Sequence, residues 1–462
     1  MSLFTIAWKS IRQRSLASLL TGLSVALGVS LMVAVLVING IITKMFSQSG
    51  TGFDLIIGPR GSAVQLVLST IYRIDDPIEN LPWDYYLEVE GDPRVAKAIP
   101  VGFGDFTELG AFPIIGTLPP YFSIDVVAGT PFQVDGDFLQ STWDAVIGSE
   151  VAKQNGWSIG SKFKMIHGGR DATESHVHDE EFTVQGILAP TGTPNDRTAF
   201  VHLDGFFLLD GHETPANEAL EARASFWNLT LEETREKYAA DIKTLEAEAA
   251  HDHSGHDHGH GHAHVVPGLQ KEVTSILVVM ATDPKSKLPA SLQRSTRALG
   301  FQSHIKQENR AMAVSPVEPM RKLLDNLVGN VRLVLLCLTC LIIFVAGVSI
   351  LVSIYNSMSD RKREIAVMRA LGARRQTVFA IILAESLLLC VGGGLFGILL
   401  GHGLVFAAAP IVEARSGLLI NPMAFEFAEL IIIPVTIALA GLVGFLPGMT
   451  AYRTDVAQAL SS

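Results

Sequence analysis

Four long apolar stretches constrain this chain more than any other feature of its sequence. They cover residues 17–42, 331–355, 377–409 and 430–446. Because an α-helix rises about 1.5 Å per residue, such stretches can cross a hydrocarbon core of about 30 Å. The last one is the shortest and contains Pro434. We therefore expect a membrane protein with four transmembrane helices.

The first apolar stretch follows a basic segment, as the core of a secretory signal peptide would. Its run of 26 residues is much longer than the roughly 7 to 15 of a signal peptide, and no small-x-small cleavage site follows it. We expect an uncleaved helix.

The basic residues indicate the orientation, because short cytoplasmic segments are enriched in lysine and arginine. Residues 1–16 hold three basic groups and no acid, and residues 357–376 hold six basic groups, whereas 410–429 hold only Arg415. Both termini and the 357–376 loop are therefore predicted to face the cytoplasm. The segment 43–330 is predicted to lie outside, and with 23 basic and 39 acidic residues it is strongly acidic.

These patterns predict a division of the chain into nine parts. They are a cytoplasmic amphipathic lead-in (1–16), transmembrane helix 1 (17–42), an extracytoplasmic domain (43–316), a stalk with transmembrane helix 2 (317–356), a cytoplasmic coupling loop (357–376), transmembrane helix 3 (377–409), an outer loop (410–429), transmembrane helix 4 (430–447) and a cytoplasmic tail (448–462).

The extracytoplasmic domain is predicted to be α+β. Short apolar runs alternate with glycine and proline, which is typical of strands and turns, as in "GFDLIIGPRGSAVQLVLSTIYRI". Residues 285–300 predict a helix, and "FQSHIKQ" after it a strand. All three cysteines, Cys337, Cys340 and Cys390, lie in the membrane stretches, so this domain cannot use disulfides.

A segment over 214–266 looks like an insertion between two strands of this domain. Residues 214–250 are rich in alanine, glutamate and leucine and predict one or two exposed helices, with Thr230 and Glu233 resembling a capping box. The run "HDHSGHDHGHGHAH" follows directly.

Histidine imidazoles are good ligands for zinc, copper and nickel. A second candidate patch is "ESHVHDEE", so two patches occur in one acidic domain, and zinc is the expected ion. The alternative is a solvated loop without a physiological metal, and a catalytic metal is not expected. The candidate metal ligands are His251, His253, His256, His258, His260, His262, His264, His176 and His178.

Gly393, Gly397 and Gly401 recur every four residues in the third apolar stretch. Small residues at this spacing let helices approach closely, so we expect helix packing here. The partner helix could belong to the same chain or to a second copy in a dimer. The membrane stretches contain no chain of carboxylates, which argues against a cation-driven transporter or a zinc channel.

Three segments together carry a resemblance to a known family. They are "LFTIAWKSIRQRSLASLLTGLSVALGVS", "YNSMSDRKREIAVMRALGARRQTVFAIILAES" and "GFLPGMTAYRTDVAQAL". With this order around one large outer domain, the chain resembles the MacB/FtsX-type permeases of ABC transporters, which include the LolC and LolE permeases. The resemblance is strongest over 1–60 and 320–462.

The resemblance implies that the 357–376 loop contains a coupling helix that docks on an ATPase. The residues alone also allow a loop that only sets topology and touches lipid headgroups. The implied coupling residues are Arg361, Arg363, Glu364, Ile365, Met368, Arg369, Leu371 and Gly372.

The sequence contains no G-x-x-x-x-G-K-[ST] motif, and its predicted cytoplasmic parts are short. We therefore expect no enzyme activity, no intrinsic cofactor apart from a candidate metal, and ATP bound by a separate ABC ATPase. The resemblance implies a dimer with a second copy or a paralogue in a bacterial inner membrane, and nucleic acid is not an expected partner.

Two functions stay open from the sequence. One is export or extraction of a substrate, linked to zinc or another divalent metal. The other is FtsX-like regulation of an extracytoplasmic partner without transport. An extracytoplasmic lipoprotein, adaptor or metal-binding protein is a candidate partner of either.

Overall fold

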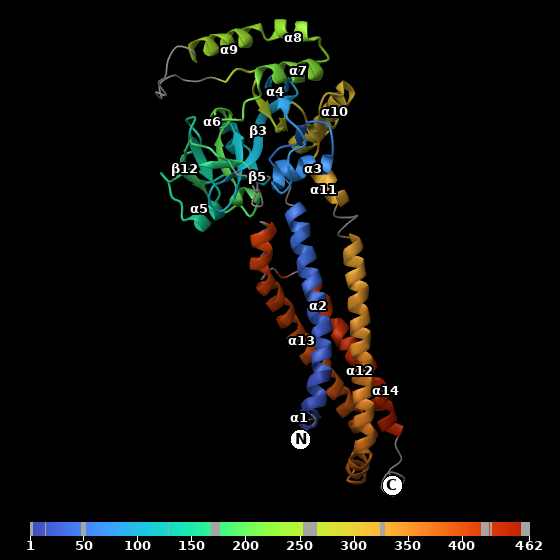
Figure 1. Cartoon of the computed structure of the whole chain (residues 1–462). Coiled ribbons are helices and arrows are strands. Elements are labelled where there is room, and N and C mark those ends of the chain that lie inside the picture. The colour runs from blue at the N-terminus through green and yellow to red at the C-terminus, as the bar shows by residue number, and fades with distance from the viewer. Residues whose placement is uncertain are drawn as a thin grey trace. The chain divides into compact units, whose positions relative to one another are not determined.

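The computed structural model describes residues 3–13, 15–47, 52–127, 129–167, 176–252, 266–323, 329–416, 425 and 427–453. The chain divides into two compact units. The membrane unit comprises Met1–Lys44 and Leu324–Ser462, and the core domain comprises Met45–Leu323 (Figure 1). The core domain is thus inserted between the first and second long apolar helices, as the sequence predicts.

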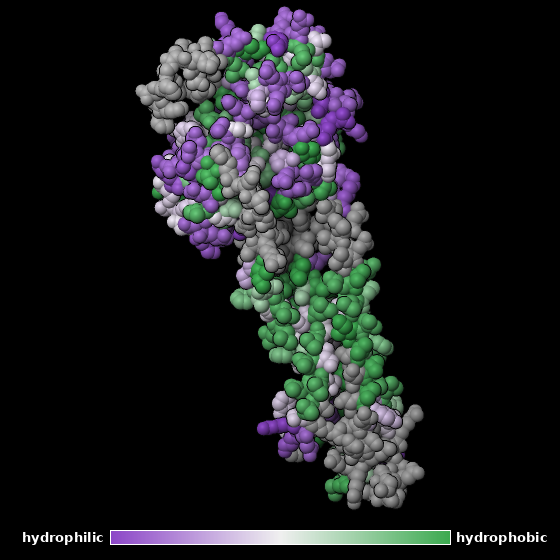
Figure 2. Space-filling model, viewed as in Figure 1, coloured by the Kyte–Doolittle hydropathy of each residue, from purple (hydrophilic) through white to green (hydrophobic). Residues whose placement is uncertain are grey.

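The membrane unit contains, among the described residues, four helices that are long and apolar enough to cross a membrane. Figure 2 shows hydrophobic residues over their surface and hydrophilic residues over the core domain. The apolar spans are Ser18–Gly40, Leu333–Val352, Arg375–Ile411 and Glu429–Thr450. The helices of this unit are α1 (Leu3–Gln13), α2 (Ser15–Ser47), α12 (Gly329–Ala370), α13 (Arg375–Ser416), η5 (Phe427–Ile431) and α14 (Ile432–Arg453).

The core domain is built on a mostly antiparallel sheet of twelve strands, whose main path runs β16-β1-β15-β3-β4-β13-β8-β12-β7. The β8–β12 and β4–β13 pairs are parallel. The strands are β1 (Leu55–Gly58), β3 (Val95–Thr107), β4 (Pro113–Thr117), β7 (Val134–Gly136), β8 (Asp144–Ile147), β9 (Lys162–Phe163), β10 (Met165–His167), β11 (His176–Val177), β12 (Phe182–Leu188), β13 (Ala199–His202), β15 (Ser275–Met280) and β16 (Met312–Val314). Two small sheets pair β2 (Leu81–Pro82) with β14 (Glu272–Val273), and β5 (Asp125–Val127) with β6 (Thr130–Pro131).

Both faces of the large sheet are buried. Successive side chains of a strand point to opposite faces, and all four residues of β1 are buried. In β1, Leu55 and Ile57 belong to one buried cluster and Ile56 to another. We call the side of Leu55 and Ile57 the first face and the side of Ile56 the second face. A core on two faces suits a domain that has no cysteine.

Short helices supply side chains to both faces of the sheet. Residues of α4, α6 and α10 belong to the cluster of the first face, and residues of α3, η1 and η2 to that of the second. These helices, with the others of the domain outside the predicted insertion, are α3 (Ala63–Val67), η1 (Leu68–Tyr72), α4 (Trp83–Glu90), η2 (Pro119–Ser123), α5 (Ser149–Asn155), η3 (Pro194–Arg197), α6 (Leu203–Phe207), α10 (Ala290–Glu308) and α11 (Val317–Leu323).

Two predicted strand segments are helical. The strand expected at "FQSHIKQ" was wrong, because α10 continues to Glu308 and buries Ala298, Phe301 and Ile305 at helical spacing. Residues 63–72 form α3 and η1 instead of continuing the strand-and-turn pattern. In both cases the apolar residues also fit a helical period, and short apolar runs do not distinguish helix from strand.

The described residues of the predicted insertion, up to Asp252, form three helices where the sequence predicts one or two. They are α7 (Ala216–Trp227), α8 (Leu231–Lys237) and α9 (Ala239–Asp252). The capping box at the start of α8 is present: the Thr230 hydroxyl accepts from the Glu233 amide, and the Glu233 carboxylate accepts from the Thr230 amide.

A buried arginine anchors the insertion to the rest of the domain. Arg223 of α7 is 1% exposed. Its guanidinium donates to the carbonyl oxygens of Leu269 and Lys271 at 2.9 and 2.8 Å, and to the Glu272 carboxylate at 3.0 Å. Planar bidentate donors make such bonds geometrically specific.

Candidate functional site

The predicted coupling segment is the end of a transmembrane helix. Residues 357–370 continue α12 without a break, so they do not form the separate short helix expected from the sequence. With 42 residues, α12 is about 63 Å long, about twice a hydrocarbon core. Gly372 follows its end with φ +101°, a conformation that glycine adopts without strain.

The side chains of this segment differ in exposure. Ile365 is 4% exposed and belongs to the buried cluster of the membrane unit, so it packs internally instead of presenting a surface. Met368 packs partly against the same cluster, and Arg369 is half-buried. Leu371 is 83% exposed at the tip. The side chains of Arg361, Arg363 and Glu364 lie outside the described residues, although their backbone is helical.

The three regularly spaced glycines of α13 lie against α2 of the same chain. A Cβ atom at Gly393 would lie 2.8 Å from the carbonyl oxygen of Gly22, and one at Gly401 would lie 2.7 Å from Cβ of Val33. These glycines therefore serve packing within the chain, where small residues allow two backbones to approach.

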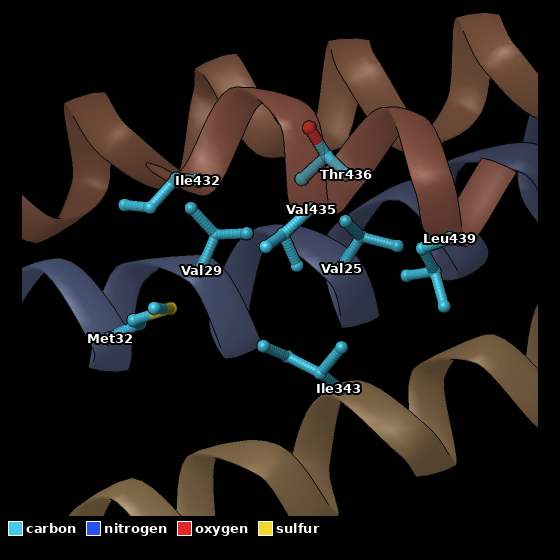
Figure 3. A pocket seen from close by; sticks show the side chains of 8 residues that line it. All are labelled: Val25, Val29, Met32, Ile343, Ile432, Val435, Thr436 and Leu439. Atoms are coloured by element: carbon cyan, nitrogen blue, oxygen red, sulfur yellow. The ribbon is translucent and has the colours of Figure 1, made fainter. Parts of the chain in front are cut away.

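An apolar pocket lies between α2, α12 and α14 (Figure 3). Its single polar lining residue is Thr436, whose hydroxyl donates to the carbonyl oxygen of Ile433 in its own helix. The lining carries no charge that could hold a polar ligand. The residues are Val25, Val29, Met32, Ile343, Ile432, Val435, Thr436 and Leu439.

Most of the predicted metal ligands lie outside the described residues. These are the six histidines between 253 and 264, and the side chains of His251 and His176 are also not described. His178 is described, and it is 1% exposed.

His178 belongs to a compact cluster with Asp105, His167 and His212. One ligand atom from each of these residues lies within 4.8 Å of the others. Asp105 Oδ1 lies 2.6 Å from His167 Nδ1, and Asp105 Oδ2 lies 2.8 Å from His212 Nε2. The three imidazole centroids are 4.6 to 5.1 Å apart. Three imidazoles and one carboxylate form a donor set that suits zinc and related divalent ions.

A bulge in β3 directs Asp105 into this cluster. Phe103 pairs with Ile115 and Asp105 pairs with Ile114, so Gly104 is the extra residue. In a regular strand Asp105 would lie on the same face as Phe103, which is the second face. The bulge turns it to the first face, where Ile114 lies. Bulges commonly redirect a side chain in this way.

The other ligands come from elements beside the end of β3. His167 ends β10 and is directly opposite Asp105 across the strand pair. The amide of His178, just after β11, donates to the carbonyl oxygen of Met165. His212 follows α6 in a turn where Gly211 has φ +83°, and its ring packs on Phe206.

Charge within the cluster favours an anionic carboxylate. Burial would raise the pKa of Asp105, but its contacts with His167 and His212 outweigh burial and hold that pKa at about 2. The contact with Asp105 raises the pKa of His167. Asp105 is therefore ionised at neutral pH.

Sequence reasoning missed Asp105, His167 and His212. A glycine followed by an acid within a strand pattern, "GFGDF", was the available signal for a bulge. The two histidines stand alone in the sequence, and only strand pairing brings them together.

Two family profiles match the chain. The profile described as FtsX-like permease C-terminal matches residues 336–456, and that described as MacB-like periplasmic core domain matches residues 18–245.

Individual relatives match over shorter stretches. The macrolide export ATP-binding/permease protein MacB of Rhodopirellula baltica is 25% identical over 191 residues, which are 41% of this chain and 27% of the relative. A probable export ATP-binding/permease protein MacB of Pseudomonas entomophila is 30% identical over 146 residues, 30% of this chain and 21% of the relative. The alignments thus span about a quarter of these relatives.

A solved structure is also similar: the crystal structure of the periplasmic region of MacB from Actinobacillus actinomycetemcomitans. The match covers 62% of this chain and 98% of the solved chain, with 11% identity and a TM-score of 0.31.

The two family profiles, the curated relatives and the position of the core domain between the first two membrane helices agree. The chain belongs to the MacB/FtsX-type family of ABC transporter permeases.

Proposed function

We propose that this chain is a permease subunit that couples ATP hydrolysis by a separate cytoplasmic ATPase to movements of its core domain. The observation that carries the proposal is the continuity of α12 from its apolar span to the exposed tip at Leu371. A continuous helix transmits a displacement along its axis, because its backbone hydrogen bonds resist stretching and bending.

The tip has the composition of a docking surface. Leu371 is largely exposed, and Arg374 and Arg375 beside it are exposed as well. An apolar side chain flanked by arginines fits an apolar pocket with an acidic rim, since arginine is enriched at interfaces. The relatives named above are ATP-binding/permease proteins, which supports a permease that works with an ABC ATPase.

The proposal extends to the substrate. Export or extraction of a substrate on the side of the core domain, with a link to zinc or another divalent metal, fits the histidine content of that domain. A pair of permeases with two ATPases is the assembly that the family implies.

The docking proposal is tested by Leu371→Asp. The tagged chain would be purified from its native membranes with its bound ATPase and placed in lipid nanodiscs, where ATP turnover is measured. Leu371→Asp is expected to lower ATPase retention and turnover by about tenfold or more, which corresponds to about 1.4 kcal/mol of lost binding. Leu299→Asp on α10 is the matched control, because Leu299 is also an exposed leucine.

Normal retention in Leu371→Asp would contradict docking at this tip. Absence of any P-loop protein from the purified complex would contradict the separate ATPase. Normal ATP coupling with activation of a soluble outer partner, and no substrate displaced, would identify the regulatory alternative.

A further inference from the structure

We propose that Asp105, His167, His178 and His212 bind one zinc ion inside the core domain. This site is distinct from the histidine run, with which it shares no residue. The proposal rests on the geometry of the core domain alone and does not depend on coupling to an ATPase.

The four donor atoms fit a closed tetrahedral shell. A tetrahedral zinc ion with bonds of about 2.0 to 2.1 Å separates its ligand atoms by roughly 3.3 Å. The four atoms now lie within 4.8 Å of one another, so side-chain shifts on the order of 1 Å complete the shell. Four protein ligands leave no open position for a reacting water, so the site would hold a metal without catalysis.

The nitrogen–oxygen contacts of Asp105 with His167 and His212 are short, but they do not have the geometry of hydrogen bonds. Its two carboxylate oxygens and His212 Nε2 are buried without a hydrogen bond of acceptable geometry, although the N–O distances are 2.6 and 2.8 Å. Asp105 is 1% exposed, and leaving a buried carboxylate unsatisfied is costly. A cation bound by the carboxylate and the ring nitrogens would give these buried atoms the partner that they do not find in one another.

The ion would also have a route to solvent and a supported ligand. The side chain of His167 is 41% exposed, so the cluster is open on one side. His167 also forms a hydrogen bond to the backbone of Asp210. Such a second interaction fixes the orientation of a metal-binding imidazole.

Binding would join three parts of the domain. They are the end of β3, the β10–β11 hairpin and the turn at 208–212 that leads to the helical insertion. We therefore infer a zinc ion that fastens the hairpin and the start of the insertion to the sheet.

The test must remove the binding capacity of the histidine run. A background variant of the full chain would carry asparagine at His251, His253, His256, His258, His260, His262 and His264. Zinc binding to this variant in detergent is measured by competition with a chromophoric chelator, and the cobalt-substituted form by visible absorption. One tight zinc per chain and a tetrahedral cobalt spectrum are expected.

Asp105→Asn and His212→Asn in this background test the ligands. Because even outer-shell partners are worth about 10- to 100-fold in metal affinity, each change is expected to weaken zinc binding at least about 100-fold. His304→Asn on α10 is the control and should leave binding unchanged. Circular dichroism and thermal unfolding without metal establish that each variant is folded.

Two outcomes would overturn the site. One is a folded background variant that binds no zinc. The other is undiminished affinity in folded Asp105→Asn and His212→Asn.

Discussion

Gly397 of α13 lies so close to α2 that a Cβ atom at this position would stand 2.6 Å from the carbonyl oxygen of Ala26. Cβ atoms essentially never lie within 3.0 Å of a non-bonded backbone atom, so any side chain here must separate the two helices. The two backbones are thus in direct contact. The same Cβ atom would also lie 2.7 Å from Cβ of Val29, so it has no free space on that side either.

Gly397→Ala is therefore expected to destabilise the membrane unit by about 1 to 3 kcal/mol, the usual cost of overpacking. Gly403→Ala in the same helix is the matched control, because a Cβ atom there would meet nothing within 4 Å. Thermal unfolding in detergent, followed by circular dichroism, measures both. Equal midpoints for the two variants would show that the close approach is not important for stability.

Arg223→Ala is expected to loosen the insertion from the core domain. Removing one partner of a buried ion pair lowers the free energy of unfolding by about 3 to 5 kcal/mol. We expect a smaller loss here, because the Glu272 side chain is 19% exposed. Hydrogen exchange should accelerate in α7 and near Leu269, whose carbonyl oxygen loses its donor. Arg235→Ala on exposed α8 provides the control. Unchanged exchange in α7 would contradict the anchoring role.

The bulge at Gly104 gives a sharper test of how the zinc site is built. Deletion of Gly104 removes the extra residue and makes Asp105 the direct successor of Phe103, so Asp105 should stay opposite Ile114 on the first face. Zinc binding should therefore be kept in the background variant without the histidine run. Gly104→Ala should bind zinc normally, because its φ is not positive and a Cβ atom has space. Competition with a chromophoric chelator compares both variants with the background variant, and loss of zinc binding in a folded deletion variant would contradict the assignment of Gly104 as the extra residue.

Much of the architecture was predictable, because it depends on local pattern. The four membrane helices follow from long apolar runs, and the start of α8 follows from Thr230 and Glu233. The helix over residues 301–308 was missed because Phe301 and Ile305 fit both a strand and a helix until their packing is known.

The metal cluster could be predicted only in part, because it depends on tertiary pairing. His178 was identified from a local concentration of histidine and acid. Asp105 and His167 are 62 positions apart and meet only through the β3–β10 pair. His212 follows a different helix. No periodic pattern in the sequence predicts these tertiary contacts.

The histidine run and ATP turnover are predicted to be linked through zinc. The reason is its place in the chain. The run begins with the last two residues of α9, in the insertion whose start we propose is fastened to the sheet by zinc. Turnover by the complex in nanodiscs would be measured with and without free Zn²⁺, in the intact chain and after deletion of residues 251–264. We expect zinc to change turnover in the intact chain and the deletion to abolish that response. A response that survives the deletion but is lost in Asp105→Asn would assign sensing to the buried cluster instead. Equal turnover in all four conditions would mean that the run is not coupled to ATP hydrolysis, and would direct the search for a substrate to lipoproteins and lipids.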